Sequence, residues 1–194
     1  SNLTFEQACS LPVVGTAVVE CFRRAAPKRG EKILIQTACG GTGLLALQLA
    51  AHHGLEVYAT AGSEAKLDYL RSLGVSQCIN YVTSDFEQEI ARLTNGRGVD
   101  VVFNTLGGDA LEKGIRCLAP SGRYVELAMT ALRSARTVDL SSMYDNQTLH
   151  SIDMRRLFLA NGHRCEDCKR ELLRLIESGV LRPTLSRVFE LQQL

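Results

Sequence analysis

Short β-rich apolar runs alternate with longer amphipathic stretches through most of this chain. Such alternation indicates strands of a parallel sheet that are separated by helices. We expect strands at 32–37, 56–61, 77–80, 99–104, 122–127 and 148–152, with helices near 43–53, 64–73, 85–94 and 108–118 between the first five. The repeated unit predicts an α/β fold class, a doubly wound parallel sheet (Rossmann fold) of about six strands with helices on both faces.

Two helices are predicted before the first strand. The first covers Leu3 to Leu11, with Thr4 as its N-cap and Gln7 completing a capping box. A longer apolar helix follows from Val13 to Ala26 and ends at a turn that contains proline and glycine. The length of the chain is within the range of one domain, so we expect a single core.

The regular alternation ends after Leu127. Residues 128–147 form a long polar stretch without a clear element, which we expect to cross the top of the sheet or to pack beside it. Further along, the pattern predicts an amphipathic helix from Glu166 to Ser178, with Gly179 as its C-cap. Alternating residues from Leu185 to Leu191 predict one more strand.

Composition and charge exclude several classes of partner. Of the 194 residues, 45% are hydrophobic and 22% are charged, and the formal net charge is +1. A charge this small gives no electrostatic case for a nucleic acid or an anionic membrane as a partner. No apolar run approaches the length of a membrane span, and the first residues lack the pattern of a signal peptide. We therefore expect no nucleic-acid partner and no membrane partner.

The 7 cysteines are scattered through apolar segments. Their odd number and the missing signal pattern favour reduced thiols and a cytoplasmic location. Cys165 and Cys168, with His163 beside them, have half of the spacing of a zinc site, but no second pair stands at a suitable distance. We therefore predict no metal site and interpret this stretch as a polar loop and the start of a helix.

The most informative stretch covers residues 33–50 and reads ILIQTACGGTGLLALQLA. An apolar strand meets a loop of small residues, and a helix follows at once. This order suits the pyrophosphate of a dinucleotide, because the free N–H groups and the dipole of a helix N-terminus attract phosphate. The loop fits A-x-G-x-x-G through Ala38, Gly40 and Gly43, where the strict fingerprint has glycine in place of Ala38.

The end of the second predicted strand bears on which dinucleotide binds. NAD-selective sites place Asp or Glu there to bind the ribose 2′-hydroxyl. In this chain the tip of that strand reads Thr60-Ala61-Gly62-Ser63, and no carboxylate follows until Glu64. Ser63, Lys66 on the following helix and Tyr81 after the third strand could instead bind a 2′-phosphate through charge-assisted hydrogen bonds. This combination favours NADP(H) as the cofactor.

The loops after the fourth and fifth strands are expected to lie near the nicotinamide end of the cofactor. Paired glycines in the first loop permit close backbone approach, and Glu126 in the fifth strand is either a functional carboxylate or one satisfied by neighbouring backbone. Residues 3–194 are thus predicted to form an NADP(H)-binding Rossmann domain. The predicted cofactor contacts are Thr37, Ala38, Cys39, Gly40, Gly41, Thr42, Gly43, Ser63, Lys66, Tyr81, Thr105, Leu106, Gly107, Gly108, Leu127 and Ala128.

Several motifs in their order resemble the medium-chain dehydrogenase/reductase superfamily. They are LPVVGTAVVECF, ILIQTACGGTGLLALQLA, ATAGSEAKLDYLRSLGV, GVDVVFNTLGG and LAPSGRYVEL. Together they are similar to the quinone oxidoreductase-like branch and to the enoyl reductase domains of modular polyketide and fatty acid synthases. The later segment SARTVDLSSMYDNQTLHSIDMRRL resembles the polyketide type. The resemblance covers about Leu3 to Leu194.

This resemblance implies an NADPH-dependent enoyl reductase. Hydride would move to the β-carbon of an α,β-unsaturated acyl thioester, and a proton would then reach the α-carbon. The implied partners are an acyl carrier protein that holds the substrate, the neighbouring synthase domains and, in a homodimer, a second copy of the chain. The family places a substrate-binding GroES-like domain before the segment that opens this chain, so the chain by itself is expected to be inactive.

The catalytic residues implied by the resemblance are only partly retained. Synthase-type enoyl reductases carry Gly-Lys after the fifth strand, with the lysine as a proposed proton donor, whereas this chain has Ala128 and Met129. Methionine cannot donate a proton. The family's partner aspartate corresponds to Asp153, which is a catalytic candidate or a helix N-cap. Arg133 is the nearest cation downstream, and its guanidinium could stabilise an enolate but is a poor acid.

Three other functions stay open from the sequence. The chain could belong to a stand-alone quinone or enone reductase of the same superfamily. It could be a non-catalytic nucleotide-binding module, which Met129 favours. A class I methyltransferase also uses a small-residue loop, but that fold usually needs an acid at the tip of the second strand, which this chain lacks.

Overall fold

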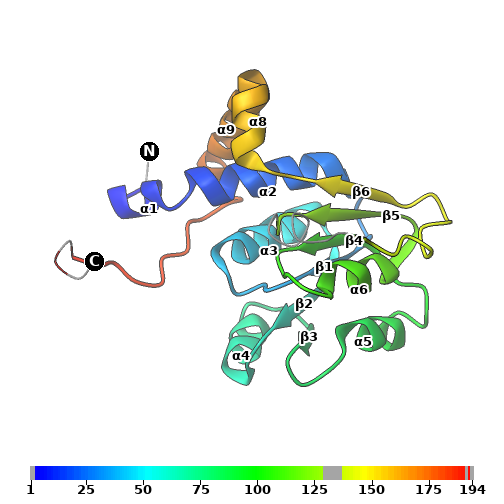
Figure 1. Ribbon diagram of the computed structural model, residues 1–194. Coiled ribbons are helices and arrows are strands. Elements are labelled where there is room, and N and C mark those ends of the chain that lie inside the picture. The colour runs from blue at the N-terminus through cyan, green and yellow to red at the C-terminus, as the bar shows by residue number, and fades with distance from the viewer. Residues whose placement is uncertain (1–2, 129–136, 191, 193–194) are drawn as a thin grey trace.

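One parallel sheet between two layers of helices organises the chain (Figure 1). The computed structural model describes residues 3–128, 137–190 and 192. The strands are β1 (Lys32–Ile35), β2 (Glu56–Ala61), β3 (Gln77–Asn80), β4 (Val99–Asn104), β5 (Leu118–Glu126) and β6 (Thr148–Ser151). Their order is β3-β2-β1-β4-β5-β6, and every neighbouring pair is parallel. Strands β2 and β3 thus lie on one side of β1, and β4, β5 and β6 lie on the other side. In folds of this kind ligands bind in the crevice where the strand order switches, here between β1 and β4.

Helices cover both faces of this sheet (Figure 1). They are α1 (Phe5–Cys9), α2 (Pro12–Ala25), α3 (Gly41–His53), α4 (Glu64–Ser72), α5 (Phe86–Leu93), α6 (Ala110–Arg116), α8 (Met154–Ala160) and α9 (Gly162–Glu177). Alternate strand residues point to opposite faces. Ile33 and Ile35 pack in a core with α2, α3, α4 and α9, whereas Leu34 packs in a second core with α5 and α6.

The structure confirms the predicted fold class and all six predicted strand positions to within a few residues. The predicted capping box is also present, because Thr4 Oγ1 accepts from the N–H of Gln7 and the Gln7 side chain accepts from the N–H of Thr4. These elements were predictable because their signals are local, namely apolar period and cap chemistry.

Helix α8 has no counterpart in the sequence prediction, and α9 begins earlier than the predicted Glu166. Met154, Leu157 and Phe158 have helical spacing, but α8 has only 7 residues and buries none of them, so it is shorter than the window that a periodicity analysis needs. Side-chain caps define both starts: Asp153 accepts from the N–H of Arg156, and Asn161 accepts from the N–H of Arg164.

The strand predicted from Leu185 to Leu191 is wrong for the described residues, since 185–190 form no strand. A strand needs a neighbour to take its backbone hydrogen bonds. The chain just before this segment is attached to α3 and not to the sheet. The Gln48 side chain accepts from the N–H of Arg182 and donates to its carbonyl. Apolar and polar residues do alternate here, but none of the described strands pairs with residues 185–190.

The long polar stretch at 128–147 was expected either to cross the top of the sheet or to pack beside it, and its described part packs beside the sheet. Within residues 137–147, Val138 and Met143 contact the core on the α5 and α6 face. The carbonyl of Asp145 accepts from the N–H of Ser121 at 2.7 Å, which holds the segment to the start of β5. The remaining part of the stretch lies outside the described residues.

Replacing Gly114 with alanine tests the packing between α6 and the sheet. A Cβ at Gly114 would lie 2.6 Å from Cε2 of Tyr124, whose ring is fully buried. We expect Gly114→Ala to lower the free energy of unfolding by about 1–3 kcal/mol, since overpacking exceeds the gain in helix propensity. Urea unfolding followed by circular dichroism measures it. Gly162→Ala is the control, because nothing lies within 4 Å of that position; equal stability changes in both variants would contradict the prediction.

Candidate functional site

The first feature of the site is the open N-terminus of α3. The helix follows β1 after a short loop, and its N-cap Gly40 has extended backbone and no side chain that could cap the first turn. The Gly40 carbonyl accepts from the N–H of Leu44. The N–H groups of the first turn therefore have no partner within the helix and stay available to an anion.

Close packing fixes how α3 leaves the loop. A Cβ at Gly43 would lie 2.6 Å from both the Cα and the carbonyl oxygen of Ala38, so only glycine fits. Ala38 is fully buried, and its N–H donates to the carbonyl of Thr60 on β2 at 2.9 Å. By contrast, nothing lies within 4 Å of a Cβ at Gly41. The loop is packed on its inner side and open on its outer side.

A second loop meets the first across the crevice between β1 and β4. The hydroxyls of Thr37 and Thr105 are hydrogen-bonded to each other, and Thr105 Oγ1 also donates to the carbonyl of Gln36 at 3.2 Å. Thr37 has a positive φ of 48°, a conformation that costs energy for a β-branched residue. The structure thus brings predicted cofactor residues of the β1 and β4 loops into contact.

The three residues predicted to bind a 2′-phosphate lie around the ends of β2 and β3. Tyr81 lies over Gly62, because its hydroxyl would be 2.9 Å from a Cβ there. Ser63 and Lys66 are exposed on the first turn of α4, and the carbonyl of Lys66 accepts from the Cys39 thiol at 3.2 Å. No ion pair engages Lys66 anywhere in the part of the chain that the structure describes.

The nearest carboxylate to this strand end is already engaged. Glu64 accepts from Nδ2 of Asn80 at 3.2 Å and lies 3.7 Å from the guanidinium of Arg71. Its contacts are therefore on β3 and on its own helix. This arrangement leaves a hydroxyl, a phenol and an ammonium at the end of β2, which suits an anionic group better than a ribose hydroxyl.

These observations fit a dinucleotide. The open outer face of Gly41 and the uncapped first turn of α3 provide the phosphate position. The adenosine end would lie toward Ser63, and the nicotinamide end toward the loops after β4 and β5. Which of the predicted residues touch the cofactor stays a prediction.

The loops after β4 and β5 are tied together by a buried carboxylate. Glu126 is fully buried and accepts from the N–H of Ala128 at 2.5 Å, from Nδ2 of Asn104 at 2.8 Å and from the hydroxyl of Tyr124 at 3.3 Å. Burial raises the pKa of the Glu126 carboxyl above its usual range, and the hydrogen bonds from Asn104, Ala128 and Tyr124 oppose that rise. Of the two interpretations of Glu126, the hydrogen bonds match the one in which neighbouring groups satisfy it.

Asn104 and Tyr124 were not predicted as parts of the site. Both are fully buried, and a one-dimensional sequence does not show that they share a carboxylate. The available signal was a polar residue at the end of each of two apolar strands, at Asn104 and Glu126, which the register places side by side.

The proposed catalytic residues are placed only in part. Asp153 is the N-cap of α8, and its Oδ1 accepts from the N–H of Arg156 at 3.1 Å. Its capping role is therefore established, whereas a catalytic role stays a prediction. Met129 and Arg133 lie outside the described residues.

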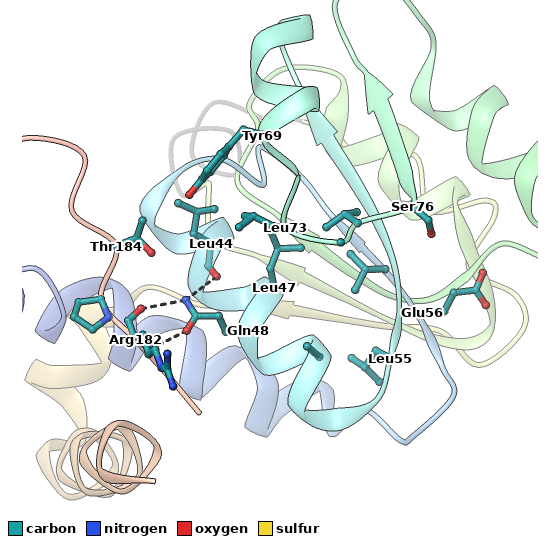
Figure 2. A pocket seen from close by; sticks show the side chains of 15 residues that line it. Leu44, Leu47, Gln48, Leu55, Glu56, Tyr69, Leu73, Ser76, Arg182 and Thr184 are labelled. Carbon is teal, nitrogen blue, oxygen red and sulfur yellow. Dashed lines mark hydrogen bonds between the residues drawn. The ribbon is translucent and has the colours of Figure 1, made fainter. Parts of the chain in front are cut away.

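An apolar cavity lies apart from these residues. A groove of about 600 Å³ runs between α3, α4 and the segment around Arg182, as Figure 2 shows. Its walls are mainly apolar, with Leu44, Leu47 and Leu73 facing it, and none of the predicted cofactor contacts lines it. We therefore place the candidate site at the carboxyl ends of the strands and not in this groove.

The cysteine pair does not form a metal site in the described structure. Cys165 and Cys168 are buried in α9, and the Cys168 thiol donates to the Glu20 carboxylate at 3.4 Å. Among the described residues no group of three or more His, Cys, Asp or Glu side chains could hold a metal ion. No helix in the same residues is long and apolar enough to cross a membrane.

Comparison with known proteins gives consistent matches. Residues 41–178 match the family model described as zinc-binding dehydrogenase. A highly reducing polyketide synthase of Didymella fabae is 33% identical over 185 residues, which cover 94% of this chain and 10% of the relative. The chain thus spans about a tenth of the length of this curated relative.

Solved structures resemble the chain over most of its length. The nucleotide-binding subdomain of the enoylreductase domain of PpsC from Mycobacterium tuberculosis has a TM-score of 0.82 and 31% identity, covering 90% of this chain and 98% of that one. A quinone oxidoreductase of Pseudomonas syringae has a TM-score of 0.80 and 27% identity, covering 94% of this chain and 56% of that one. Both likenesses agree with the resemblance seen in the sequence motifs.

The raised pKa of Glu126 predicts a pH effect on stability. The unfolded chain releases this proton near the ordinary value of 4.5 and the folded chain only at higher pH, so folding stability is lost as pH rises through this interval. The unfolding free energy of the wild type minus that of Glu126→Gln should therefore fall between about pH 4 and about pH 8. Urea unfolding at a series of pH values measures this difference, and a constant or rising difference would contradict the prediction.

Proposed function

The chain belongs to the zinc-binding dehydrogenase family, and from this premise we propose that it is the NADPH-binding domain of an enoyl reductase in a polyketide synthase. The observation that carries the proposal is the uncapped first turn of α3, which faces the crevice between β1 and β4. Membership of this family supports a nicotinamide dinucleotide as the ligand of this crevice.

The choice of NADPH over NADH depends on charge at the end of β2. A 2′-phosphate would meet the ammonium of Lys66 and the hydroxyls of Ser63 and Tyr81. Glu64, the first carboxylate after this strand, accepts from Asn80 and lies 3.7 Å from the guanidinium of Arg71, which offsets part of its charge. Support for NADPH therefore comes from the groups that are present and from the engagement of the nearest acid.

The remaining residues would orient the cofactor. The N–H groups at the start of α3 would bind the pyrophosphate, and the loops after β4 and β5 would hold the nicotinamide end. Bound NADPH supplies a hydride. The chain would hold the dinucleotide in a single orientation, so that the hydride can be transferred in one direction only. No metal-assisted step is assigned, because the described residues offer no ligand set for one.

The proposed substrate is an α,β-unsaturated acyl thioester. The similarity to a highly reducing polyketide synthase and to an enoylreductase domain supports this substrate class. An acyl carrier protein would hold the thioester, and the neighbouring synthase domains and a second copy of the chain are the other proposed partners. A reducing cytoplasmic setting is supported by the cysteines, all of which are free.

Charge reversal at Lys66 tests the cofactor choice. Lys66→Glu should weaken NADPH binding about 10-fold or more, because a charge-assisted hydrogen bond to the 2′-phosphate is lost and repulsion replaces it. NADH carries no such phosphate, so its affinity should change by less than about twofold. Isothermal titration calorimetry with both dinucleotides measures the effect.

Lys28→Glu is the matched control, because it changes the net charge equally at an exposed lysine near the amino end of β1. It should leave both affinities unchanged. An unaltered preference for NADPH in Lys66→Glu would contradict the assignment, and so would wild-type binding of NADPH no tighter than NADH.

A labelling experiment tests the reaction in the protein that contains this chain together with its flanking sequence. With NADPH that carries deuterium at the transferred position, an enoyl thioester should gain one deuterium at its β-carbon, detected by NMR. Reduction of a quinone but not of the thioester would favour the quinone reductase alternative. NADPH binding without turnover of either substrate would favour the non-catalytic module.

A further inference from the structure

Four buried polar side chains line the carboxyl edge of the sheet. Thr60, Gln36, Asn104 and Glu126 end neighbouring strands or follow them directly, and each is 0% exposed. Ile35 pairs with Ala59 and with Phe103, so the next residues along these strands also stand in one row. The register pairs Asn104 with Glu126, which completes the row across β2, β1, β4 and β5.

Members of this row hold the loops above them. Thr60 Oγ1 accepts from the N–H of Thr37 in the β1 loop at 3.2 Å. Asn104 holds Leu106 from both sides: its Oδ1 accepts from the Leu106 N–H at 3.0 Å, and its Nδ2 donates to the Leu106 carbonyl at 2.9 Å. Each of these side chains thus sets the path of a loop at the candidate site.

Glu126 couples the two loops near the expected nicotinamide position. One carboxylate oxygen binds the N–H of Ala128 in the β5 loop, and the other binds Nδ2 of Asn104, which in turn holds the β4 loop. The backbone adds a further link, since the N–H of Leu127 donates to the carbonyl of Asn104 at 3.0 Å. Ala128 cannot shift without losing its hydrogen bond to the buried carboxylate, and Leu106 cannot shift without losing those to Asn104, which the same carboxylate holds.

This network also decides which backbone groups remain for a ligand. The N–H groups of Leu106, Leu127 and Ala128 are all used internally. Gly107 and Gly108 are exposed, and nothing lies within 4 Å of a Cβ at either one. Gly108 has a positive φ of 71°, which glycine adopts without strain. The network therefore presents an open pair of glycines at a fixed place.

The composition of the network argues against packing alone as its purpose. Burying a carboxylate is expensive even when it is hydrogen-bonded, and an apolar residue would fill the same volume at lower cost. A carboxylate is able to do what an apolar side chain cannot, which is to bind an N–H of one loop and an amide of another at the same time. Besides the hydroxyl of Tyr124 in β5, it binds the N–H of Ala128 after β5 and the amide of Asn104 at the end of β4.

We propose that Glu126, acting with Asn104, is a positioning residue for the nicotinamide half of the dinucleotide. It keeps the β4 and β5 loops in register so that Gly107 and Gly108 meet that half of the cofactor. It does not contribute to the binding of the adenosine half. This inference rests on the proposed function, because it presupposes a dinucleotide in the crevice.

Two ligands separate the halves of the cofactor. NADPH spans the whole site, whereas 2′,5′-ADP contains only the adenosine half with its 2′-phosphate. In calorimetric titrations of this chain, Glu126→Gln should weaken NADPH about 10-fold and change 2′,5′-ADP by less than about twofold. A glutamine amide has one acceptor oxygen and one NH₂ donor, so in either orientation the NH₂ faces a donor, the N–H of Ala128 or the pair of Asn104 Nδ2 and the Tyr124 hydroxyl, and one side of the coupling is lost.

Glu20→Gln is the matched control, because Glu20 is also 0% exposed but joins α2 to Arg164 on α9, away from both loops. It should leave both affinities unchanged, whatever it does to stability. Equal weakening of both ligands by Glu126→Gln, or no weakening of NADPH, would overturn the proposal. If the wild-type chain bound neither ligand, the proposed function itself would be contradicted.

A measurement on the unmodified chain covers the case in which Glu126→Gln does not fold. In NMR spectra, NADPH should shift the backbone amide signals of Gly107 and Gly108, and 2′,5′-ADP should not. The amides of Leu106 and Ala128 should be protected from hydrogen exchange with and without ligand, because they are bonded inside the network. Unshifted glycine signals at saturating NADPH, or rapid exchange at Leu106 and Ala128, would overturn the positioning role.

Discussion

The contact between Gly43 and the backbone of Ala38 is the constraint on which the candidate site depends. A side chain at Gly43 would collide with the Cα and the carbonyl of Ala38, so α3 can start this close to β1 only because the residue is glycine. The close start brings the open first turn of α3 to the crevice between β1 and β4. Ala38, which stands in place of the usual glycine, is fully buried and packs in the core beside α3.

The carboxyl edge of the sheet resolves a conflict between packing and chemistry. Parallel strands in such a fold are buried on both faces and are therefore apolar, whereas the loops that follow them must carry polar groups. In this chain the change occurs within one residue position, where Phe103 gives way to Asn104 and Val125 to Glu126. The polar side chains are still buried, so each must find a partner, and most of the partners are backbone groups of the loops. The hydrogen bonds that satisfy Asn104 and Glu126 therefore also shape the loops at the candidate site.

Local signals were sufficient for most of the fold. Strand positions and the α1 capping box followed from apolar period and cap chemistry, whereas the crevice between β1 and β4 became visible only with the strand order. Helix α8 escaped prediction because its 7 residues are too few for apolar periodicity to distinguish a helix. The alternation near Leu185 was real but misleading, because strand formation depends on a neighbour that the pattern of one segment cannot show. For the site, the loop after β1 was evident from its small residues. That Asn104 and Tyr124 both donate to the Glu126 carboxylate was not evident.

The amino-acid sequence by itself determined the class of fold, the position of the small-residue loop between β1 and α3, and the absence of a carboxylate from residues 60–63 at the tip of β2, because each of these depends on residues that are close along the chain. The tertiary structure alone decided that Glu64 is held by Asn80 and Arg71, that Asp153 caps a helix and that Glu126 ties two loops together. The difference has a physical reason. Helix, strand and cap signals act over a few residues, whereas the partner of a buried polar group is whichever group the register of the sheet places beside it.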